Sequence, residues 1–150
     1  MQECRGKRID NGKWVEGCLI IAKNFCCILQ DEEKVHPMDY PYLDGELGCI
    51  DGYVTPIIPK TAGKNSGEKD KNGKKIFEGD IHKNDYNDLL FVVCLGAYHD
   101  SEYEIDAYGW YMKCTSKNYI SGFSGYEHCY VNIIGNVHDN PELLEVKAND

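Results

Sequence analysis

The stretch Leu89-Leu90-Phe91-Val92-Val93-Cys94-Leu95 is an unbroken run of seven apolar residues. A run of this length is typical of a buried β-strand, because a helix in a globular protein usually needs at least about ten residues. The chain also has no window close to the roughly 18 apolar residues of a membrane-spanning helix. We therefore expect a mainly β protein that has no membrane partner.

A second strand pattern follows this run. Apolar and polar side chains alternate from Tyr103 onward, and the alternation continues through residues 103–112. Successive side chains of a strand point to opposite faces of the sheet. The pattern therefore predicts a half-buried strand with Tyr103 and Ile105 directed inward and Glu104 and Asp106 directed outward.

Further strand patterns flank these two. Residues 77–82 and residues 131–137 alternate apolar with polar side chains. Asn140-Pro141-Glu142-Leu143-Leu144 has the capping residue, early proline and acidic first turn of a short C-terminal helix. Several short strands with little helix between them predict that residues 76–150 form a small barrel or roll.

The N-terminal part begins with a hairpin signal. Asn11-Gly12 separates the strand-like residues 5–10 and 13–22, and Asn-Gly is the strongest short-range hairpin signal because both residues accept positive φ. A second hairpin is expected between residues 13–22 and 25–30, with its turn at Lys23-Asn24. The N-terminal part is therefore also rich in strands.

The middle of the chain contains the best internal boundary. Residues 31–48 are acidic and interrupted by prolines, so they predict irregular structure or one short helix, and residues 49–58 predict another strand. Residues 60–75 then hold three Gly, six Lys and no aliphatic side chain larger than alanine. Such a composition predicts an exposed loop or linker. We thus expect an N-terminal β-rich part (1–59), a Lys/Gly-rich loop or linker (60–75) and a C-terminal part (76–150).

Charge and cysteine content limit the classes of function. Sixteen Lys and Arg stand against 25 Asp and Glu, a formal net charge of −9 that opposes binding to phosphate backbones. The charged N-terminus does not lead into an apolar stretch, so it predicts no secretory signal. The eight cysteines are therefore expected to be reduced thiols of a cytoplasmic protein, with a disulfide framework as the alternative.

Known site motifs fail on their spacing. Between Gly67 and Gly73 lie five residues instead of the four of a phosphate-binding loop, and Lys75 stands where a Ser or Thr is required. A calcium loop over residues 68–79 would end on Gly79 instead of a bidentate carboxylate. Cysteines and histidines show no paired zinc spacing, although a metal site assembled from distant positions stays open. We expect no cofactor, no metal and no catalytic residue.

Three blocks of the chain resemble one family. They are RGKR at residues 5–8 with NGKWVEG at 11–17, TAGKNSGEKDKNGKKIFEGDI at 61–81, and IIGNVHDNPELL at 133–144. Together these blocks are similar, in sequence and in order, to the YopX family of phage and prophage proteins. The resemblance implies an N-terminal β-rich part, a C-terminal SH3-like barrel and no enzymatic activity.

An acidic aromatic segment is the best candidate for a binding surface. Residues 84–112 contain six acids, five tyrosines and one tryptophan, but no Lys or Arg. Because protein interfaces are enriched in Tyr and Trp, this composition favours a face that contacts protein, although the rings could instead pack in the core. The predicted face consists of Glu102, Glu104, Asp106, Tyr108 and Trp110.

We therefore interpret the chain as a phage- or prophage-encoded accessory module that binds a phage protein, a host protein or itself and catalyses nothing. One alternative is a weak nucleic-acid-binding module that uses the loop of residues 60–75. A less favoured alternative is an enzyme whose site is assembled from scattered residues. The lysines of the nucleic-acid alternative are Lys64, Lys69, Lys71, Lys74 and Lys75.

Overall fold

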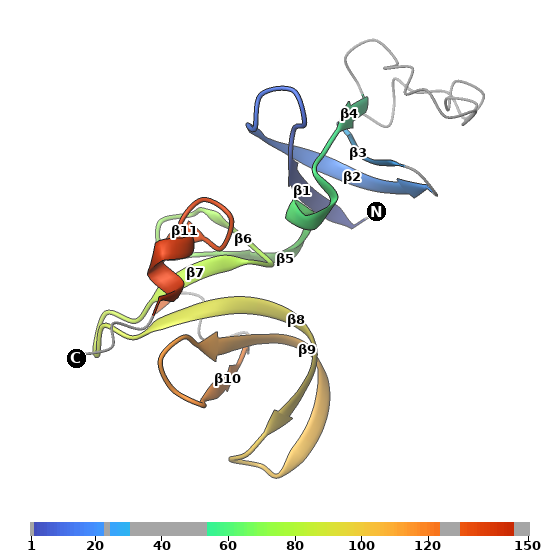
Figure 1. Cartoon of the computed structure of the whole chain (residues 1–150). Helices are drawn as coiled ribbons and strands as arrows, with labels where there is room; N and C mark the ends of the chain where they lie inside the picture. Colours follow the sequence, from blue (N-terminus) through green and yellow to red (C-terminus); the bar gives the residue numbers. More distant parts are fainter. Residues whose placement is uncertain (1, 23–24, 31–53, 124–129, 146–150) are drawn as a thin grey trace. The chain divides into compact units, whose positions relative to one another are not determined.

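The computed structural model describes residues 2–22, 25–30, 54–123 and 130–145 of the 150-residue chain. Within these ranges, the regular structure consists of two antiparallel sheets and of 3-10 turns, with no α-helix (Figure 1). The prediction of a mainly β protein is therefore confirmed. No helix in the same ranges is long and apolar enough to cross a membrane.

The chain divides into two compact units, Met1–Asn65 and Ser66–Asp150. The first unit contains an antiparallel arrangement in the order β4-β3-β2-β1-β5, and β5 continues into the second unit, where its neighbour is β6. The elements of the first unit are β1 (Glu3–Lys7), β2 (Trp14–Ala22), β3 (Phe25–Leu29), β4 (Val54–Pro56), the 3-10 turn η3 (Pro59–Thr61) and the start of β5 (Gly63–Lys69).

Both hairpins predicted in the first unit are present. β1 and β2 pair antiparallel around Asn11-Gly12, with Lys7 opposite Trp14. Gly12 has a φ of 68°, a left-handed conformation that glycine adopts without steric cost. β2 and β3 also pair antiparallel, while the turn predicted at Lys23-Asn24 lies outside the described residues. So do residues 31–48 and the first part of the strand predicted at 49–58.

The first unit buries apolar side chains in two clusters. Cys27 belongs to the smaller cluster, and burial, with a contribution from Cys26 beside it, raises the pKa of the Cys27 thiol to about 11. The six cysteines in the described part of the chain are all thiols. One cluster consists of Cys4, Val15, Cys26, Ile28 and Ile57, and the other of Cys27, Leu29 and Val54.

The segment 60–75 is more ordered than its composition predicts. Instead of a continuous loop or linker, it contains most of η3, the strand β5 and the start of β6. β5 is held by backbone pairing, with Lys64 opposite Cys4 and Gly63 opposite Arg5. Since backbone pairing requires no apolar side chain, composition could not reveal this strand. Exposed turn structure is confined to residues 71–74.

The second unit is built around a five-stranded antiparallel sheet with the order β10-β9-β8-β7-β11. The two edge strands of this order, β10 and β11, are not paired with each other, and no closed barrel forms among the described residues. The mainly β character predicted for this part is confirmed, while the SH3-like barrel stays a prediction. The elements that follow β5 are β6 (Lys75–Phe77), β7 (Asp80–Lys83), β8 (Leu90–Asp100), β9 (Ile105–Cys114), β10 (Ile120–Gly122), β11 (Ile133–Asn136) and the 3-10 turn η5 (Pro141–Leu144).

The core of the second unit lies against β8 and β9. The predicted strand at residues 89–95 is confirmed as the first part of β8, which pairs with β9 from Phe91 opposite Cys114 to Asp100 opposite Ile105. The buried cluster consists of Ile76, Phe91, Val93, Met112, Cys114, Val131 and Ile133.

Two predictions for this unit are wrong in detail. Residues 77–82 do not form one half-buried strand, because a turn separates β6 from β7 and Asp80 is fully buried. Its Oδ2 accepts the Phe77 N–H at 2.8 Å. At the C-terminus, η5 replaces the predicted helix. The Asn140 side chain accepts the Asn136 N–H at 3.2 Å and makes no capping bond to the turn.

Candidate functional site

The hairpin end of β8 and β9 forms a two-stranded ribbon, residues 96–109, which we call the ribbon. β7 pairs with β8 only up to Val92, and β10 pairs with β9 only from Tyr111 onward. The ribbon therefore extends past the ends of its neighbouring strands (Figure 1). Gly96 and Gly109 face each other at its base, and Gly96 has a φ of 156° that favours glycine.

The ribbon exposes large apolar side chains. The exposed fractions are 69% for Tyr103, 52% for Ile105 and 78% for Tyr108. Tyr108 lies on the same face as Trp110, which packs against the core, because these two residues of β9 are two positions apart. Ile105 lies on the opposite face. Because Tyr103 and Ile105 are both exposed, the prediction that they point into a core is wrong.

A tight turn explains why the predicted alternation fails here. Residues 101–104 form the turn, and the Asp100 Oδ1 accepts the N–H groups of Glu102 at 2.9 Å and Tyr103 at 3.2 Å. Glu104 has a φ of 52°, in the left-handed region. The regular up-and-down sequence of side chains is therefore interrupted before β9 begins at Ile105.

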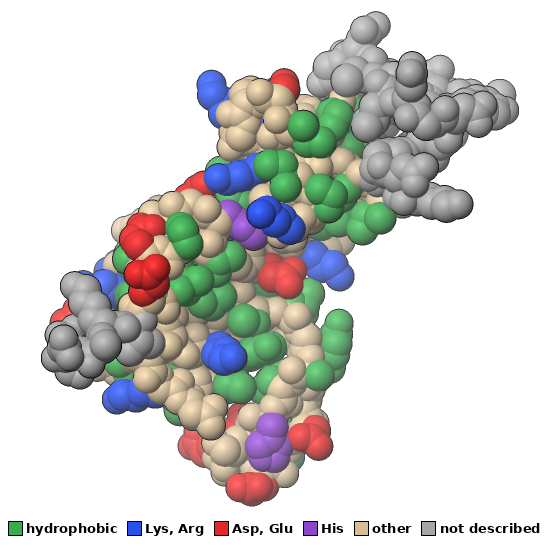
Figure 2. Space-filling model, in the orientation of Figure 1, with side chains coloured by type: hydrophobic (Ala, Val, Ile, Leu, Met, Phe, Trp, Pro, Cys, Tyr) green, Lys and Arg blue, Asp and Glu red, His purple; other side chains and the backbone are tan. Residues whose placement is uncertain are grey.

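The ribbon is strongly acidic. Its four carboxylates are accompanied by no Lys or Arg, and Figure 2 shows acidic side chains gathered around a histidine over this end of the hairpin. His99 Nδ1 lies 2.9 Å from Asp106 Oδ1, and His99 Nε2 lies 3.7 Å from Glu104 Oε2. The hydrogen bond to Asp106, aided by the charges of Asp106, Glu104 and Asp100, raises the pKa of His99.

Four of the five residues of the predicted acidic aromatic face lie on this ribbon. Glu102 and Glu104 belong to the turn, and Asp106 and Tyr108 belong to β9. All four side chains are exposed. Trp110 lies beyond the ribbon and is partly buried, with its ring 6.4 Å from that of Phe123.

The lysines of the nucleic-acid alternative are distributed over several elements. Lys64 belongs to the first unit and the other four to the second. Lys69 ends β5, Lys75 begins β6, and Lys71 and Lys74 lie in the turn between them. The Lys71 Nζ is 2.5 Å from Asp85 Oδ2, so its charge is already paired.

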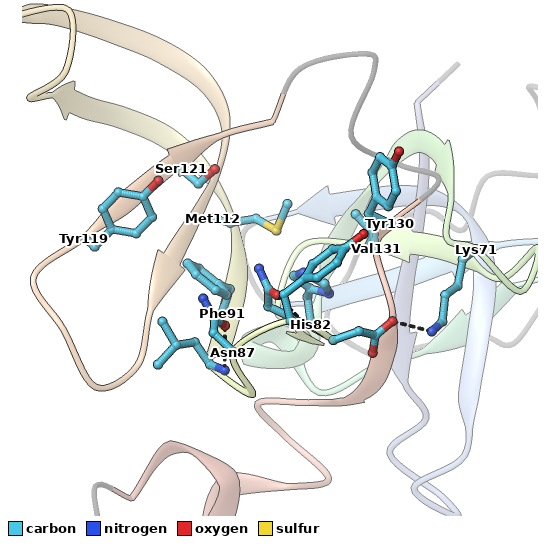
Figure 3. Close-up of a pocket in the computed structure, with 13 residues that line it drawn as sticks. Lys71, His82, Asn87, Phe91, Met112, Tyr119, Ser121, Tyr130 and Val131 are labelled. Atoms are coloured by element: carbon cyan, nitrogen blue, oxygen red, sulfur yellow. Dashed lines mark hydrogen bonds and ion pairs between the residues drawn. The ribbon is translucent and has the colours of Figure 1, made fainter.

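The second unit also contains a pocket of about 650 Å³. Its floor is apolar, and Figure 3 shows Phe91, Met112 and His82 between Tyr119 on one side and Tyr130 on the other. The sequence gives no signal for this pocket, because its lining comes from separate segments, several of them polar loops. The lining consists of Lys71, His82, Asn84, Asp85, Tyr86, Asn87, Leu89, Phe91, Met112, Tyr119, Ser121, Tyr130 and Val131.

His82 is a neutral member of this lining. Its Nδ1 accepts the Asn132 backbone N–H at 2.9 Å, which places the ring proton on Nε2. Burial lowers the pKa of His82, and the charge of Lys71 adds to this effect while the charge of Asp85 opposes it. The ring stacks on Phe91 with centroids 5.9 Å apart. His82 therefore offers the pocket an N–H donor and no charge near neutral pH.

The ion pair of Lys71 and Asp85 lies at one end of the pocket (Figure 3). The hydrogen bond from Lys71 and its charge lower the pKa of Asp85, and the Asn132 side chain donates a further, longer bond of 3.4 Å to this carboxylate. In the described part of the chain, no group of three or more His, Cys, Asp or Glu side chains could hold a metal ion.

Comparison with known proteins identifies the family. No curated protein matches the chain. The family model described as YopX protein matches residues 21–145, which include the second and third of the blocks that carry the sequence resemblance. This match spans most of the chain, and the chain therefore belongs to the YopX protein family.

Proposed function

We propose that this protein is a phage- or prophage-encoded accessory protein that acts in the bacterial cytoplasm, catalyses nothing and binds a partner protein through the ribbon. Membership of the YopX family supports the phage origin. The observation that carries the binding proposal is the ribbon itself, which combines exposed Tyr103, Ile105 and Tyr108 with four carboxylates.

The low intrinsic stability of a two-stranded ribbon supports a binding role. An isolated two-stranded hairpin is marginally stable in water at best, and within the described part of the chain the strands of residues 96–109 pair only with each other. A partner that covers Tyr103 together with Ile105 on one face of the ribbon, or with Tyr108 on the other, would bury apolar surface that the ribbon alone leaves exposed. Tyrosine is also among the side chains that contribute most at protein interfaces.

The charge of the ribbon favours a basic partner over a second copy of the chain. The second unit contains eight lysines against fifteen Asp and Glu. Two ribbons placed together would bring like charges close, which disfavours association, whereas Lys and Arg of another protein would pair with the carboxylates. The following experiment must therefore distinguish self-association from binding to a basic partner protein.

Nucleic-acid binding and catalysis have weaker support. The acidic second unit repels phosphates, and Lys71 is already paired with Asp85. Neither His82 nor His99 is hydrogen-bonded to a Ser, Thr or Cys side chain in the described part of the chain, so neither forms the nucleophile–base pair of covalent catalysis.

The test uses a double charge reversal, Glu104→Lys with Asp106→Lys, in the full-length protein. The matched control is Glu142→Lys with Glu145→Lys, which makes the same charge change at exposed positions outside the ribbon. Proteins captured from bacterial lysate are quantified for wild type and both variants, and sedimentation measures self-association.

We expect specific proteins, enriched in basic residues, that wild type and control capture and the ribbon variant loses. Equal capture by all three proteins would contradict the proposal. If wild type and control form dimers and the ribbon variant is a monomer, the partner of the ribbon is a second copy of the chain and not a basic protein.

A further inference from the structure

The pocket of the second unit is separate from the ribbon and has its own chemistry. Its volume of about 650 Å³ falls within the range of small-molecule sites, roughly 300–1,000 Å³. An apolar floor with a few polar groups at its edge is typical of such sites. The floor residues Phe91, Met112 and Val131 are buried below this opening.

Exposed aromatic rings surround this floor. Tyr86, Tyr119 and Tyr130 line the pocket, and their exposed fractions are 85%, 51% and 60%. Tyr119 is also in edge contact with Phe91, with ring centroids 6.2 Å apart. Aromatic faces that are open to solvent above an apolar floor favour a flat ring, because stacking buries both of its sides.

Two amide groups of the lining are oriented as hydrogen-bond donors. Asn84 Oδ1 accepts the Tyr86 N–H at 2.8 Å, and Asn87 Oδ1 accepts the Leu89 N–H at 3.0 Å. These bonds fix both amides and leave their Nδ2 groups without an acceptor among the described residues. The Nε2–H of His82 is a third donor. A ligand that uses them must carry acceptors, such as carbonyl oxygens or ring nitrogens.

The lining provides no unpaired charge. Lys71 and Asp85 neutralise each other at 2.5 Å, and His82 is neutral. The excess of acids over lysines in the second unit also disfavours an anion. The ligand that fits this lining is therefore uncharged.

We propose that this pocket binds an uncharged heteroaromatic ring with carbonyl or ring-nitrogen acceptors, which is the chemistry of a nucleobase. Stacking on Tyr86 and Tyr130 holds the ring, and the amides of Asn84 and Asn87 recognise its acceptors. The same ring could arrive as a free nucleoside or within a nucleic-acid strand, and the acidic surroundings favour the free nucleoside.

Met112 provides a direct readout. The chain has three methionines, so a protein labelled at its methionine methyl groups gives a simple spectrum, and Met112 lies in the pocket floor (Figure 3). The four uncharged nucleosides are titrated against full-length protein. Their 5′-monophosphates, short single-stranded oligonucleotides and N-acetyl-tyrosine amide are the comparison ligands.

We expect at least one nucleoside to shift the Met112 signal saturably at millimolar concentration or below, and to bind more tightly than its monophosphate, an oligonucleotide or N-acetyl-tyrosine amide. Tyr86→Ala and Tyr130→Ala should each weaken this binding by about fivefold or more, since stacking on one aromatic side chain contributes that much. The matched control Tyr103→Ala removes an equally exposed ring from the ribbon and should leave the affinity unchanged.

Three results would overturn the proposal. The first is a Met112 signal that no nucleoside shifts, and the second is equal affinity in Tyr130→Ala and Tyr103→Ala. The third is tighter binding of a monophosphate, an oligonucleotide or N-acetyl-tyrosine amide, which would reassign the pocket to an anion, a nucleic-acid strand or a protein side chain. None of these results depends on the ribbon, so the proposed function is tested separately.

Discussion

Asp70 connects two distant parts of the second unit, and its removal should destabilise that unit strongly. Its Oδ1 accepts the N–H groups of Asn72 and Lys74, each at 2.9 Å, within the turn that follows β5. Its Oδ2 accepts the buried N–H of Ile133 in β11 at 3.2 Å. A single carboxylate thus closes the turn and fastens it to the edge of the five-stranded sheet.

The size of the effect follows from these three bonds. Removing the partner of a buried N–H costs about 1–3 kcal/mol, and the two turn amides, which can be hydrated, add about 0.5–1.5 kcal/mol each. Asp70→Ala should therefore lower the free energy of unfolding by about 2–6 kcal/mol, a large share of the roughly 5–15 kcal/mol typical of a folded protein. Asp70→Asn keeps one acceptor but turns an NH₂ toward Ile133, so about 1–3 kcal/mol is expected.

Urea unfolding followed by tryptophan fluorescence measures these differences, because Trp110 lies at the edge of the affected core. Asp106→Asn is the control, since Asp106 is exposed and its loss should change stability by no more than about 0.5 kcal/mol. If Asp70→Ala unfolds at the same urea concentration as this control, the carboxylate does not hold the turn to β11 and the reasoning is refuted.

Three further predictions concern burial and ionisation. Ile105→Ala, on the ribbon, should change the free energy of unfolding by no more than about 0.5 kcal/mol, whereas Ile81→Ala, fully buried in β7, should cost about 2–5 kcal/mol in urea unfolding; equal costs would contradict the exposure of the ribbon. In an NMR titration, His82 should protonate below the ordinary histidine pKa of 6.5 and His99 above it. The buried His82 therefore stabilises the fold above the unfolded-state pKa and loses this contribution as pH falls below it, and a reversed order of the two titrations would contradict the assignment. Cys27, whose pKa is raised to about 11, should resist a thiol reagent in the native protein at pH 8, while all eight cysteines should react after denaturation; a denatured count well below eight would indicate disulfides.

The hairpins and the central strand of the second unit could be predicted because their signals are local. Asn11-Gly12 specifies its own turn, and the apolar run at 89–95 must be buried wherever it lies. β5 could not be predicted in this way, because its partner strand β1 lies about sixty residues earlier and pairs through the backbone. The strand predicted at residues 77–82 was wrong because the alternation pattern treats Asp80 as an exposed polar residue. The Asp80 carboxylate is instead buried, where it accepts the Phe77 N–H.

The two candidate sites also differ in whether their signals are local in the sequence. The ribbon was predicted largely from composition, because acids and tyrosines without lysine are visible in one continuous segment. The directions of the ribbon's side chains could not be predicted, because Glu104 has a left-handed backbone conformation that interrupts the alternation. The pocket could not be predicted, since residues as distant in sequence as Lys71 and Tyr130 both line it, and the backbone hydrogen bond from the Lys71 N–H to the Val131 carbonyl oxygen at 2.9 Å joins their two segments.

The central claim, that the ribbon is the surface that binds a partner protein, is tested most directly by amide hydrogen exchange. Exchange is measured along the full-length protein alone and in complex with the partner captured from lysate. The account predicts that the amides of residues 96–109 exchange more slowly in the complex, while those around the exposed control positions Glu142 and Glu145 do not change. Unchanged exchange in the ribbon, with slowing elsewhere on the chain, would contradict it.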